Sequence, residues 1–140
     1  MEYNNLSEKH YTQYKELIKS TINKEYFDIF INTVLNDNHI IMVLEDENEK
    51  LIGTGTILIE EKLTYGGCRM GHIENILIDE KYRRNGYGEQ LVNKLLEISK
   101  GKKCYRVDLN CNSELEEFYK KNGFGKKHIC MNIYFKENFS

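Results

Sequence analysis

The spacing of apolar residues changes along the 140-residue chain, and no other feature of the sequence constrains the fold as strongly. Residues 8–20 and 23–35 place apolar side chains three and four positions apart, which predicts two amphipathic helices. Residues 39–45, 50–61 and 68–79 are rich in β-branched and aliphatic side chains, which predicts three strands, the first two joined as a hairpin. We therefore expect two helices followed by an antiparallel meander.

The helical spacing returns in the second half of the chain. An apolar stripe in residues 88–101 predicts a longer helix, and we expect a strand at 104–110, a short helix at 113–121 and a final strand at 128–135. This order favours an α/β fold with a mixed, mostly antiparallel sheet flanked by helices. Because a domain usually contains about 100–200 residues, we expect residues 1–140 to form a single domain.

Composition excludes some classes of protein. Hydrophobic residues make up 40% of the chain and charged residues 30%, as in soluble globular proteins. No apolar run approaches the roughly 18 residues that cross a bilayer, and residues 1–5 are too polar to begin a secretory signal. We therefore expect a cytoplasmic protein with no membrane partner. Its four cysteines form no C-x-x-C pair, so we expect reduced thiols and no metal site.

The net charge of −2 conceals an uneven distribution of charge. Residues 1–80 contain 7 Lys/Arg and 15 Asp/Glu, a net of −8, whereas residues 81–106 contain 8 and 2, a net of +6. The basic segment is either a local anion-binding surface or an ordinary solvated surface, and charge alone does not decide between them. It is too short to favour nucleic acid as a partner, and its cations suit the phosphates of a cofactor.

Residues 81–88 read Lys-Tyr-Arg-Arg-Asn-Gly-Tyr-Gly and lie where a predicted strand ends and a predicted helix begins. Glycines here let successive N–H groups turn toward one point, and the helix start adds a positive dipole, which predicts a site for a phosphate or pyrophosphate. The residues of this site would be Arg83, Arg84, Asn85, Gly86, Tyr87 and Gly88. Glu89 excludes a P-loop and Leu91 a dinucleotide fingerprint. An ordinary turn before a helix stays an alternative.

The pattern R-x-x-G-x-G in this position resembles the acetyl-CoA pyrophosphate loop of the GNAT-type N-acetyltransferases. Further blocks are similar in order and spacing to the glucosamine-6-phosphate N-acetyltransferases. They are Gly-His-Ile-Glu-Asn-Ile at 71–76, Lys-Tyr at 81–82, Cys-Tyr-Arg at 104–106, Leu-Asn-Cys at 109–111 and Phe-Tyr-Lys-Lys-Asn-Gly-Phe at 118–124. The resemblance covers residues 51–135. It implies the GNAT acyl-CoA N-acyltransferase fold, acetyl-CoA as cosubstrate, and acetyl transfer to glucosamine 6-phosphate by direct attack of its amine, in UDP-N-acetylglucosamine biosynthesis.

The resemblance also implies roles for individual residues. Tyr119 would donate a hydrogen bond to the departing thiolate, and Glu74 would accept a proton from the amine or orient the sugar. The main-chain N–H groups of Ile76 and Ile78 would bind acetyl-CoA, while their side chains lie in the core. The expected contacts to the sugar phosphate are Glu74, Asn75, Lys103, Arg106 and Asn110. Each of these residues also has an ordinary structural interpretation, in the core or on the solvated surface.

Three positions depart from the family pattern. Asn75 and Asn110 stand where the family has acids, and Leu115 stands where many acetyltransferases have Asn. Because the two Asn residues remove negative charge near the expected amine, another small amine, such as a polyamine or another amino sugar, stays an alternative substrate. A CoA-binding module without catalysis is a further alternative, disfavoured by Glu74 and Tyr119. Family members are homodimers whose sites use both chains, which implies a homodimer to which the last strand contributes.

Overall fold

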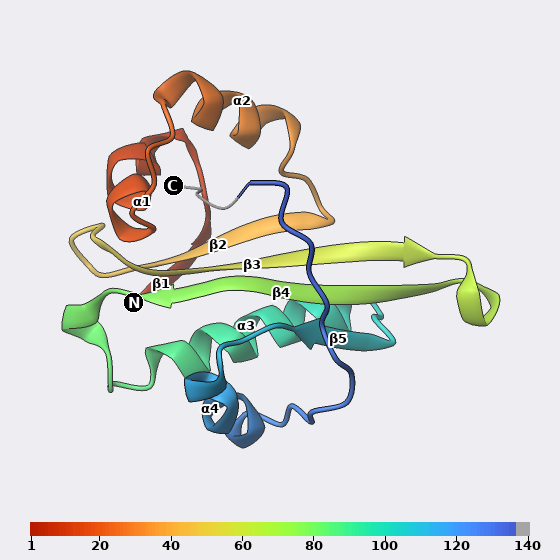
Figure 1. Ribbon diagram of the computed structural model, residues 1–140. Helices are drawn as coiled ribbons and strands as arrows, with labels where there is room; N and C mark the ends of the chain where they lie inside the picture. Colours follow the sequence, from red (N-terminus) through yellow and green to blue (C-terminus); the bar gives the residue numbers. More distant parts are fainter. Residues whose placement is uncertain (137–140) are drawn as a thin grey trace.

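A five-stranded sheet runs through the molecule in the computed structural model, which describes residues 1–136 (Figure 1). Its strands are β1 (Glu2–Asn5), β2 (His39–Glu45), β3 (Leu51–Lys62), β4 (Cys68–Ile78) and β5 (Arg106–Leu109). They lie side by side in chain order. Neighbouring strands from β1 to β4 are antiparallel and β5 is parallel to β4, which confirms the predicted mixed, mostly antiparallel sheet.

Helices cover both faces of this sheet (Figure 1). They are α1 (Tyr11–Leu17), α2 (Lys24–Thr33), α3 (Tyr87–Gly101) and α4 (Glu116–Lys121). The face under α1 and α2 has an apolar core of Leu6, Tyr14, Phe27, Ile41, Val43 and Leu51. The face under α3 has a second core of Met42, Ile57, Ile59, Ile73, Leu91 and Leu95. Among residues 1–136, no helix combines the length and apolar character needed to cross a membrane.

The N-terminal part differs in detail from the sequence prediction. The helix expected over residues 8–20 is a 3-10 turn (Glu8–His10) followed by α1. Asn23 begins α2 as expected, because its side chain accepts a hydrogen bond from the N–H of Tyr26 at 2.8 Å. The sequence pattern does not predict β1, since its residues are mostly polar and its pairing with the distant β2 leaves no local signal.

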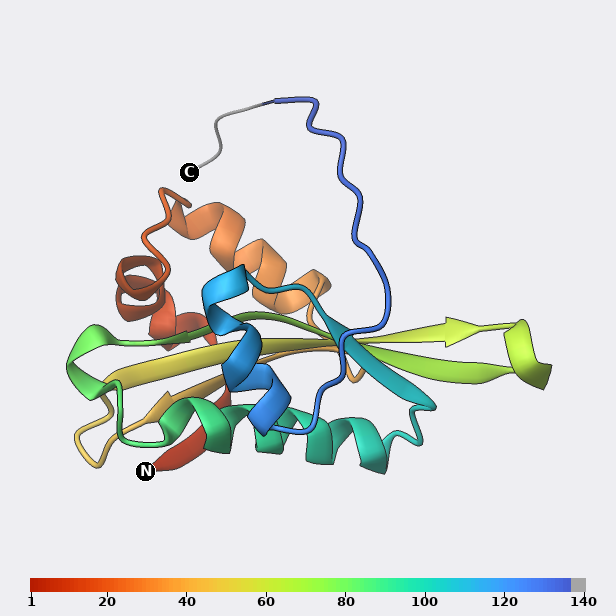
Figure 2. The same cartoon turned by 60° about the horizontal axis from the view of Figure 1, so that its bottom comes forward.

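The prediction of a final strand at residues 128–135 is wrong. These residues pair with no strand of the described chain, and Figure 2 shows the segment standing away from the sheet. The apolar side chains that alternate along it, Ile129, Met131, Ile133 and Phe135, are between 82% and 95% exposed. Alternating apolar residues show that one face of a segment is apolar. They do not show whether a neighbouring strand is present to form the hydrogen bonds of a sheet.

Two glycines of β3 make room for side chains of β4. A Cβ on Gly53 would lie 2.6 Å from Cδ1 of Ile78, and a Cβ on Gly55 would lie 2.6 Å from Cδ1 of Ile76. Such distances do not occur between unbonded carbon atoms. The two isoleucine side chains can therefore pack toward α3 only because β3 has no side chains at these positions.

Replacing Gly55 with Ala is expected to destabilise the fold by about 1–3 kcal/mol, the usual effect of overpacking a core. The added Cβ would overlap Cδ1 of Ile76 and press on Cδ1 of Leu95 at 3.0 Å. Urea unfolding measures the change. Gly101→Ala is the matched control, since nothing lies within 4 Å of its Cβ position and Ala favours the helix that ends there. Unchanged stability of the Gly55→Ala variant would contradict this account of the packing.

Candidate active site

β4 and β5 separate at one end of the sheet and leave a cavity between them. They pair over only four rows, from Met70 with Arg106 to Ile73 with Leu109. Beyond these rows β5 leads away to α4, whereas β4 continues along β3 (Figure 1). The cavity has a volume of about 190 Å³ and is lined by residues 73–76, residues 109–112, Leu115 and Tyr119.

A bulge in β4 lies at the mouth of this cavity. Between the pairs Thr54–Leu77 and Thr56–Glu74, two residues of β4 oppose one residue of β3. Asn75 occupies the bulge with a φ of 54°, a left-handed conformation that Asn adopts more readily than most residues. A bulge bends its strand and changes the direction in which neighbouring groups point.

The main chain of β4 beyond the bulge is directed into the gap. The N–H of Asp79 donates to the carbonyl oxygen of Ile52 at 2.8 Å, so the main-chain groups of the preceding residue, Ile78, point away from β3. The carbonyl oxygen of Ile78 accordingly accepts a hydrogen bond from Nε of Arg83 at 2.9 Å. The side chains of Ile76 and Ile78 both lie against glycines of β3, so the two-residue repeat of a strand directs the N–H of Ile76 to the same side as that of Ile78. Because β5 has left this side, the two N–H groups can bind an extended ligand instead of a strand.

The predicted phosphate loop connects β4 to α3. Gly86 adopts a φ of 81° and caps the helix, which begins at Tyr87. The side-chain amide of Asn85 donates to the carbonyl oxygens of two preceding residues, each at 3.1 Å, and so fixes the turn. The first N–H groups of a helix have no acceptor within it and lie at its positive end. The loop therefore presents N–H groups, together with the exposed Arg83 and Arg84, to an anion.

Aromatic residues join this loop to the cavity. A Cβ on Gly88 would lie 3.4 Å from Cζ of Phe118 and 3.9 Å from Cγ1 of Ile78. The ring of Phe118 packs edge-on against Tyr119, with 5.0 Å between centroids, and Phe124 packs on Tyr119 at 5.8 Å. Tyr119 is only 8% exposed, and it lines the cavity. Packed aromatic side chains therefore connect the start of α3 to the wall of the cavity.

The environment of Tyr119 keeps its hydroxyl protonated. Burial, and secondarily the neighbouring Cys111, raise the pKa of Tyr119 above that of an ordinary phenol. Its hydroxyl can therefore donate a hydrogen bond across the whole range of neutral and moderately alkaline pH.

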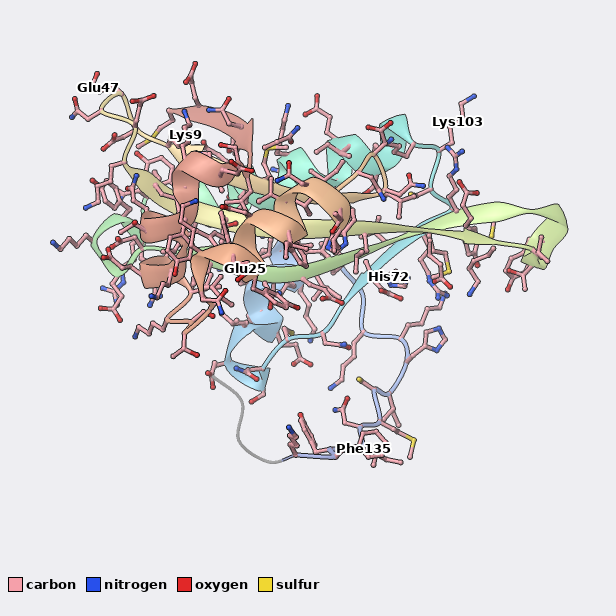
Figure 3. All side chains as sticks on the ribbon, turned by 90° about the horizontal axis from the view of Figure 1, so that it is seen from above. Lys9, Glu25, Glu47, His72, Lys103 and Phe135 are labelled. Atoms are coloured by element: carbon pink, nitrogen blue, oxygen red, sulfur yellow. The ribbon has the colours of Figure 1, made fainter. Side chains whose placement is uncertain are left out.

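The structure brings together most of the residues that the sequence assigns to the sugar phosphate. Glu74, Asn75 and Asn110 line the cavity. Arg106 does not line the cavity: it is the first residue of β5, at the end of the strand away from the cavity, and its Nη2 is 3.9 Å from Oδ2 of Asp108. Lys103 is not brought to the cavity, because it lies in the turn after α3, at the opposite end of β5 (Figure 3).

Sequence reasoning does not single out every residue of the site. Asn112 lines the cavity because it follows β5, where that strand leaves the sheet, and its only signal is this position, which emerges once the strand boundaries are known. Cys111 and Leu115 also line the cavity; the sequence names Cys111 within the Leu-Asn-Cys block and Leu115 as a departure from the family pattern, but assigns neither a role in the site. Among residues 1–136, no group of three or more His, Cys, Asp or Glu side chains is placed to hold a metal ion.

Comparison with known sequences identifies related proteins. The family model described as Acetyltransferase (GNAT) family matches residues 4–124. A rice protein (Oryza sativa subsp. japonica) named probable glucosamine 6-phosphate N-acetyltransferase 2 is 39% identical over 104 residues, which cover 72% of this chain and 63% of that protein. The chain thus spans less than two thirds of the length of this relative. The Arabidopsis thaliana glucosamine 6-phosphate N-acetyltransferase is 33% identical over 121 residues, covering 84% of this chain and 81% of that protein.

Solved structures agree with the sequence relatives. The crystal structure of the Arabidopsis thaliana glucosamine-6-phosphate N-acetyltransferase superposes with a TM-score of 0.90 at 30% identity, covering 96% of this chain and 98% of the other. A Trypanosoma brucei acetyltransferase superposes with a TM-score of 0.89 at 26% identity, covering 96% of this chain and 99% of the other. The separation of β4 from β5 thus occurs in a fold shared with acetyltransferases.

Gly86→Ala is expected to raise the KM for acetyl-CoA about tenfold, because the left-handed conformation costs an alanine about 1–2 kcal/mol. Steady-state kinetics at saturating acceptor measure the change. Gly66→Ala is the matched control: Gly66 has a similar φ of 77°, and no atom lies within 4 Å of either Cβ position. Because Gly66 lies in the β3–β4 turn, its variant should keep the wild-type KM. If Gly86→Ala also kept it, the pyrophosphate would bind elsewhere.

Proposed function

Because the chain belongs to the GNAT acetyltransferase family, we propose that it transfers the acetyl group of acetyl-CoA to the amine of glucosamine 6-phosphate. The observation that carries the proposal is the cavity in which Glu74 and Tyr119 lie beside the main chain of Ile76. The names of the rice and Arabidopsis relatives support the choice of acceptor. So do the sequence blocks between Gly71 and Phe124.

Acetyl-CoA fits the residues that surround the cavity. Its thioester would supply an activated acetyl group. The N–H groups of residues 84–88, with Arg83 and Arg84, would hold its pyrophosphate, since this loop combines a positive helix end with two cations. The N–H groups of Ile76 and Ile78 would hold the pantetheine and the acetyl oxygen. One N–H aimed at an oxygen that gains negative charge contributes roughly 3–4 kcal/mol to such reactions.

Tyr119 is positioned to assist the leaving thiolate. A thiol has a reference pKa of about 8.5 and a phenol of about 10. Burial raises the pKa of Tyr119 further, so complete proton transfer from its hydroxyl to the thiolate is unfavourable. We therefore assign Tyr119 the role of a hydrogen-bond donor that stabilises the thiolate as the bond to the acetyl group breaks.

Glu74 would act on the attacking amine. Its carboxylate is exposed at the cavity, where it can accept a proton from the amine directly or through a water molecule. It can also orient the sugar by accepting a hydrogen bond. Asn75 and Asn110 would supply uncharged hydrogen-bonding groups beside it. Arg106 would bind the phosphate, and a phosphate contact from Lys103 stays a prediction.

We propose that the active form is a homodimer. The segment of residues 125–136 exposes alternating apolar side chains and leaves the body of its own chain, with Phe135 far from the sheet (Figure 3). Such a segment would bury these side chains by pairing with a second copy of the chain. That copy would supply the neighbouring strand that the alternating pattern of residues 128–135 predicts. The segment would then contribute to the acceptor site of the other copy.

The proposed substrates also suggest a pathway and a cellular location for the reaction. We propose that residues 1–140 form a single acetyltransferase domain that supplies N-acetylglucosamine 6-phosphate for UDP-N-acetylglucosamine biosynthesis. We assign it to the cytoplasm, where thiols stay reduced, and the cysteines at 68, 104, 111 and 130 are all free. Its partners would be small molecules, with neither nucleic acid nor membrane required.

A different small amine is the second candidate acceptor, because of Asn75 and Asn110. Both line the cavity, and both are uncharged where the resembling family has acids. A site with less negative charge binds an ammonium group less strongly, so the preference for glucosamine 6-phosphate over other amines would differ from that of the family. Direct competition between glucosamine 6-phosphate and a polyamine or another amino sugar would distinguish the candidate acceptors.

Release of free CoA thiol tests the proposed function. Acetyl-CoA mixed with the protein should release thiol when glucosamine 6-phosphate is added, and mass spectrometry should show the N-acetylated sugar phosphate. Parallel reactions contain glucosamine, spermidine or no acceptor. Thiol release with another amine but not with glucosamine 6-phosphate would contradict the proposed acceptor and retain the reaction class. Acetyl-CoA binding without turnover of any amine would favour a binding module.

Tyr119→Phe is expected to lower kcat about 10- to 100-fold while changing the KM for acetyl-CoA less than twofold, because only the hydrogen bond to the thiolate is lost. Tyr105→Phe is the matched control, since this tyrosine is exposed and lies outside the cavity. Turnover of the Tyr119→Phe variant at the wild-type rate would remove Tyr119 from the mechanism.

The double substitution Ile129→Lys and Ile133→Lys is expected to convert the dimer into a monomer, because two charges cannot be buried between copies without partners. Sedimentation velocity of each variant measures the mass. Ile29→Lys is the control, as this residue is also an exposed isoleucine but lies on α2. A wild-type chain that sediments as a monomer would overturn the proposal.

A further inference from the structure

Three hydrogen-bonded side chains cross β3, β4 and β5 beside the proposed acceptor site. Nδ1 of His72 bonds to Oδ1 of Asp108, and its Nε2 lies 2.9 Å from Oε1 of Glu60. Two cations lie further out: Nη2 of Arg106 is 3.9 Å from Asp108, and Nζ of Lys62 is 4.0 Å from Glu60. The roles assigned above use neither the histidine nor the two acids.

The contacts of His72 require a protonated ring. A carboxylate oxygen only accepts hydrogen bonds, so each ring nitrogen must carry a proton to bond with its acid. Partial burial lowers the pKa of His72, but its hydrogen bonds to Glu60 and Asp108 outweigh that effect and raise the pKa overall. The hydrogen bond to His72 also lowers the pKa of Glu60. The group is therefore an imidazolium between two carboxylates.

The side chain of His72 lies on the face of the sheet opposite α3. Its neighbours Gly71 and Ile73 face that helix: a Cβ on Gly71 would lie 3.1 Å from Oγ of Ser99, and Ile73 belongs to the core under α3. Successive side chains of a strand alternate between faces. Figure 3, seen from the side of α1 and α2, shows His72 clear of both helices.

This face also carries the proposed contacts for the sugar phosphate. Glu74 follows His72 by two residues on β4. Arg106 precedes Asp108 by two residues on β5, and Asn110 directly follows the end of that strand. Side chains two residues apart on a strand are separated by about 7 Å. Asp108 therefore lies between the group that would bind the phosphate and the groups that would bind near the amine.

We propose that Asp108 is a specificity-determining residue of the acceptor site, where it accepts a hydrogen bond from a sugar hydroxyl, and that His72 is its positioning residue. This inference rests on the proposed function. The Asp108 side chain is 46% exposed, so a ligand can reach it, while His72 holds one of its oxygens in place. Since β4 and β5 separate one row beyond this pair, the same bond holds the two strands together at the base of the cavity.

The arrangement predicts a dependence on pH. Below the raised pKa of His72, the imidazolium bonds to both acids and fixes Asp108. As the pH rises through that pKa, the ring loses one proton and presents a lone pair to one of the carboxylates. The charged groups that face the ring are Glu60 and Asp108, with Lys62 and Arg106 beyond them. The KM for the acceptor should therefore be low below the pKa of His72 and increase above it.

Asp108→Asn tests the proposal. The variant is expected to raise the KM for glucosamine 6-phosphate about tenfold or more, as when a hydrogen bond to a charged group is lost. The KM for acetyl-CoA should stay unchanged. Glu61→Gln is the matched control, because it removes one carboxylate charge from β3, where Glu61 pairs with Arg69 at 2.7 Å. An unchanged acceptor KM in an active Asp108→Asn variant would overturn the proposal.

NMR titration of the imidazole provides a readout that does not need turnover. The pKa of His72 should fall in the Asp108→Asn variant and stay unchanged in Glu61→Gln, and the pH at which the acceptor KM rises should shift with it. A His72 pKa that is the same in Asp108→Asn as in the wild type would also overturn the inference. Absence of wild-type turnover with glucosamine 6-phosphate would instead contradict the proposed function, so the two failures are distinguishable.

Discussion

Only four residue pairs join β4 to β5, and the rest of the site depends on where that pairing stops. If the two strands continued together, the N–H groups of Ile76 and Ile78 would be used by the sheet. Because β5 departs after Leu109, these groups face an opening, and residues 110–112 become its opposite wall. The departure also carries the chain into α4, which brings Tyr119 to the same opening.

Packing on the other face of the sheet keeps this opening in place. Gly53 and Gly55 admit the side chains of Ile78 and Ile76, which anchors β4 while its main chain faces the gap. α3 has two functions in the structure. Its residues Leu91 and Leu95 fill the core beneath the sheet, and its first turn, with the residues just before it, forms the predicted phosphate loop. The proposed anion site is therefore fixed relative to β4 by the same helix that stabilises the sheet.

The sequence predicts those parts of the molecule whose causes are local. Periodic apolar residues predict the helices and the long strands, and the glycines at 86 and 88 predict the loop. It does not predict β1, whose stability depends on a partner strand far along the chain, or the roles of Gly53 and Gly55, which depend on side chains of β4. Lys103 and Arg106 illustrate the same limit, because the sequence does not reveal which end of β5 faces the cavity. The segment 128–135 has the pattern of a strand but no partner strand in its own chain.

The central claim is that the gap between β4 and β5 is the acetyl-CoA site, and amide chemical shifts during an acetyl-CoA titration test it most directly. The account predicts that the largest changes occur at Ile76, Ile78 and residues 84–88. A second groove, with a volume of about 640 Å³, lies between β1 and α3 and is lined by Tyr3 and Lys94 among others. Large shifts at that groove, with the amides of Ile76 and Ile78 unchanged, would contradict the account.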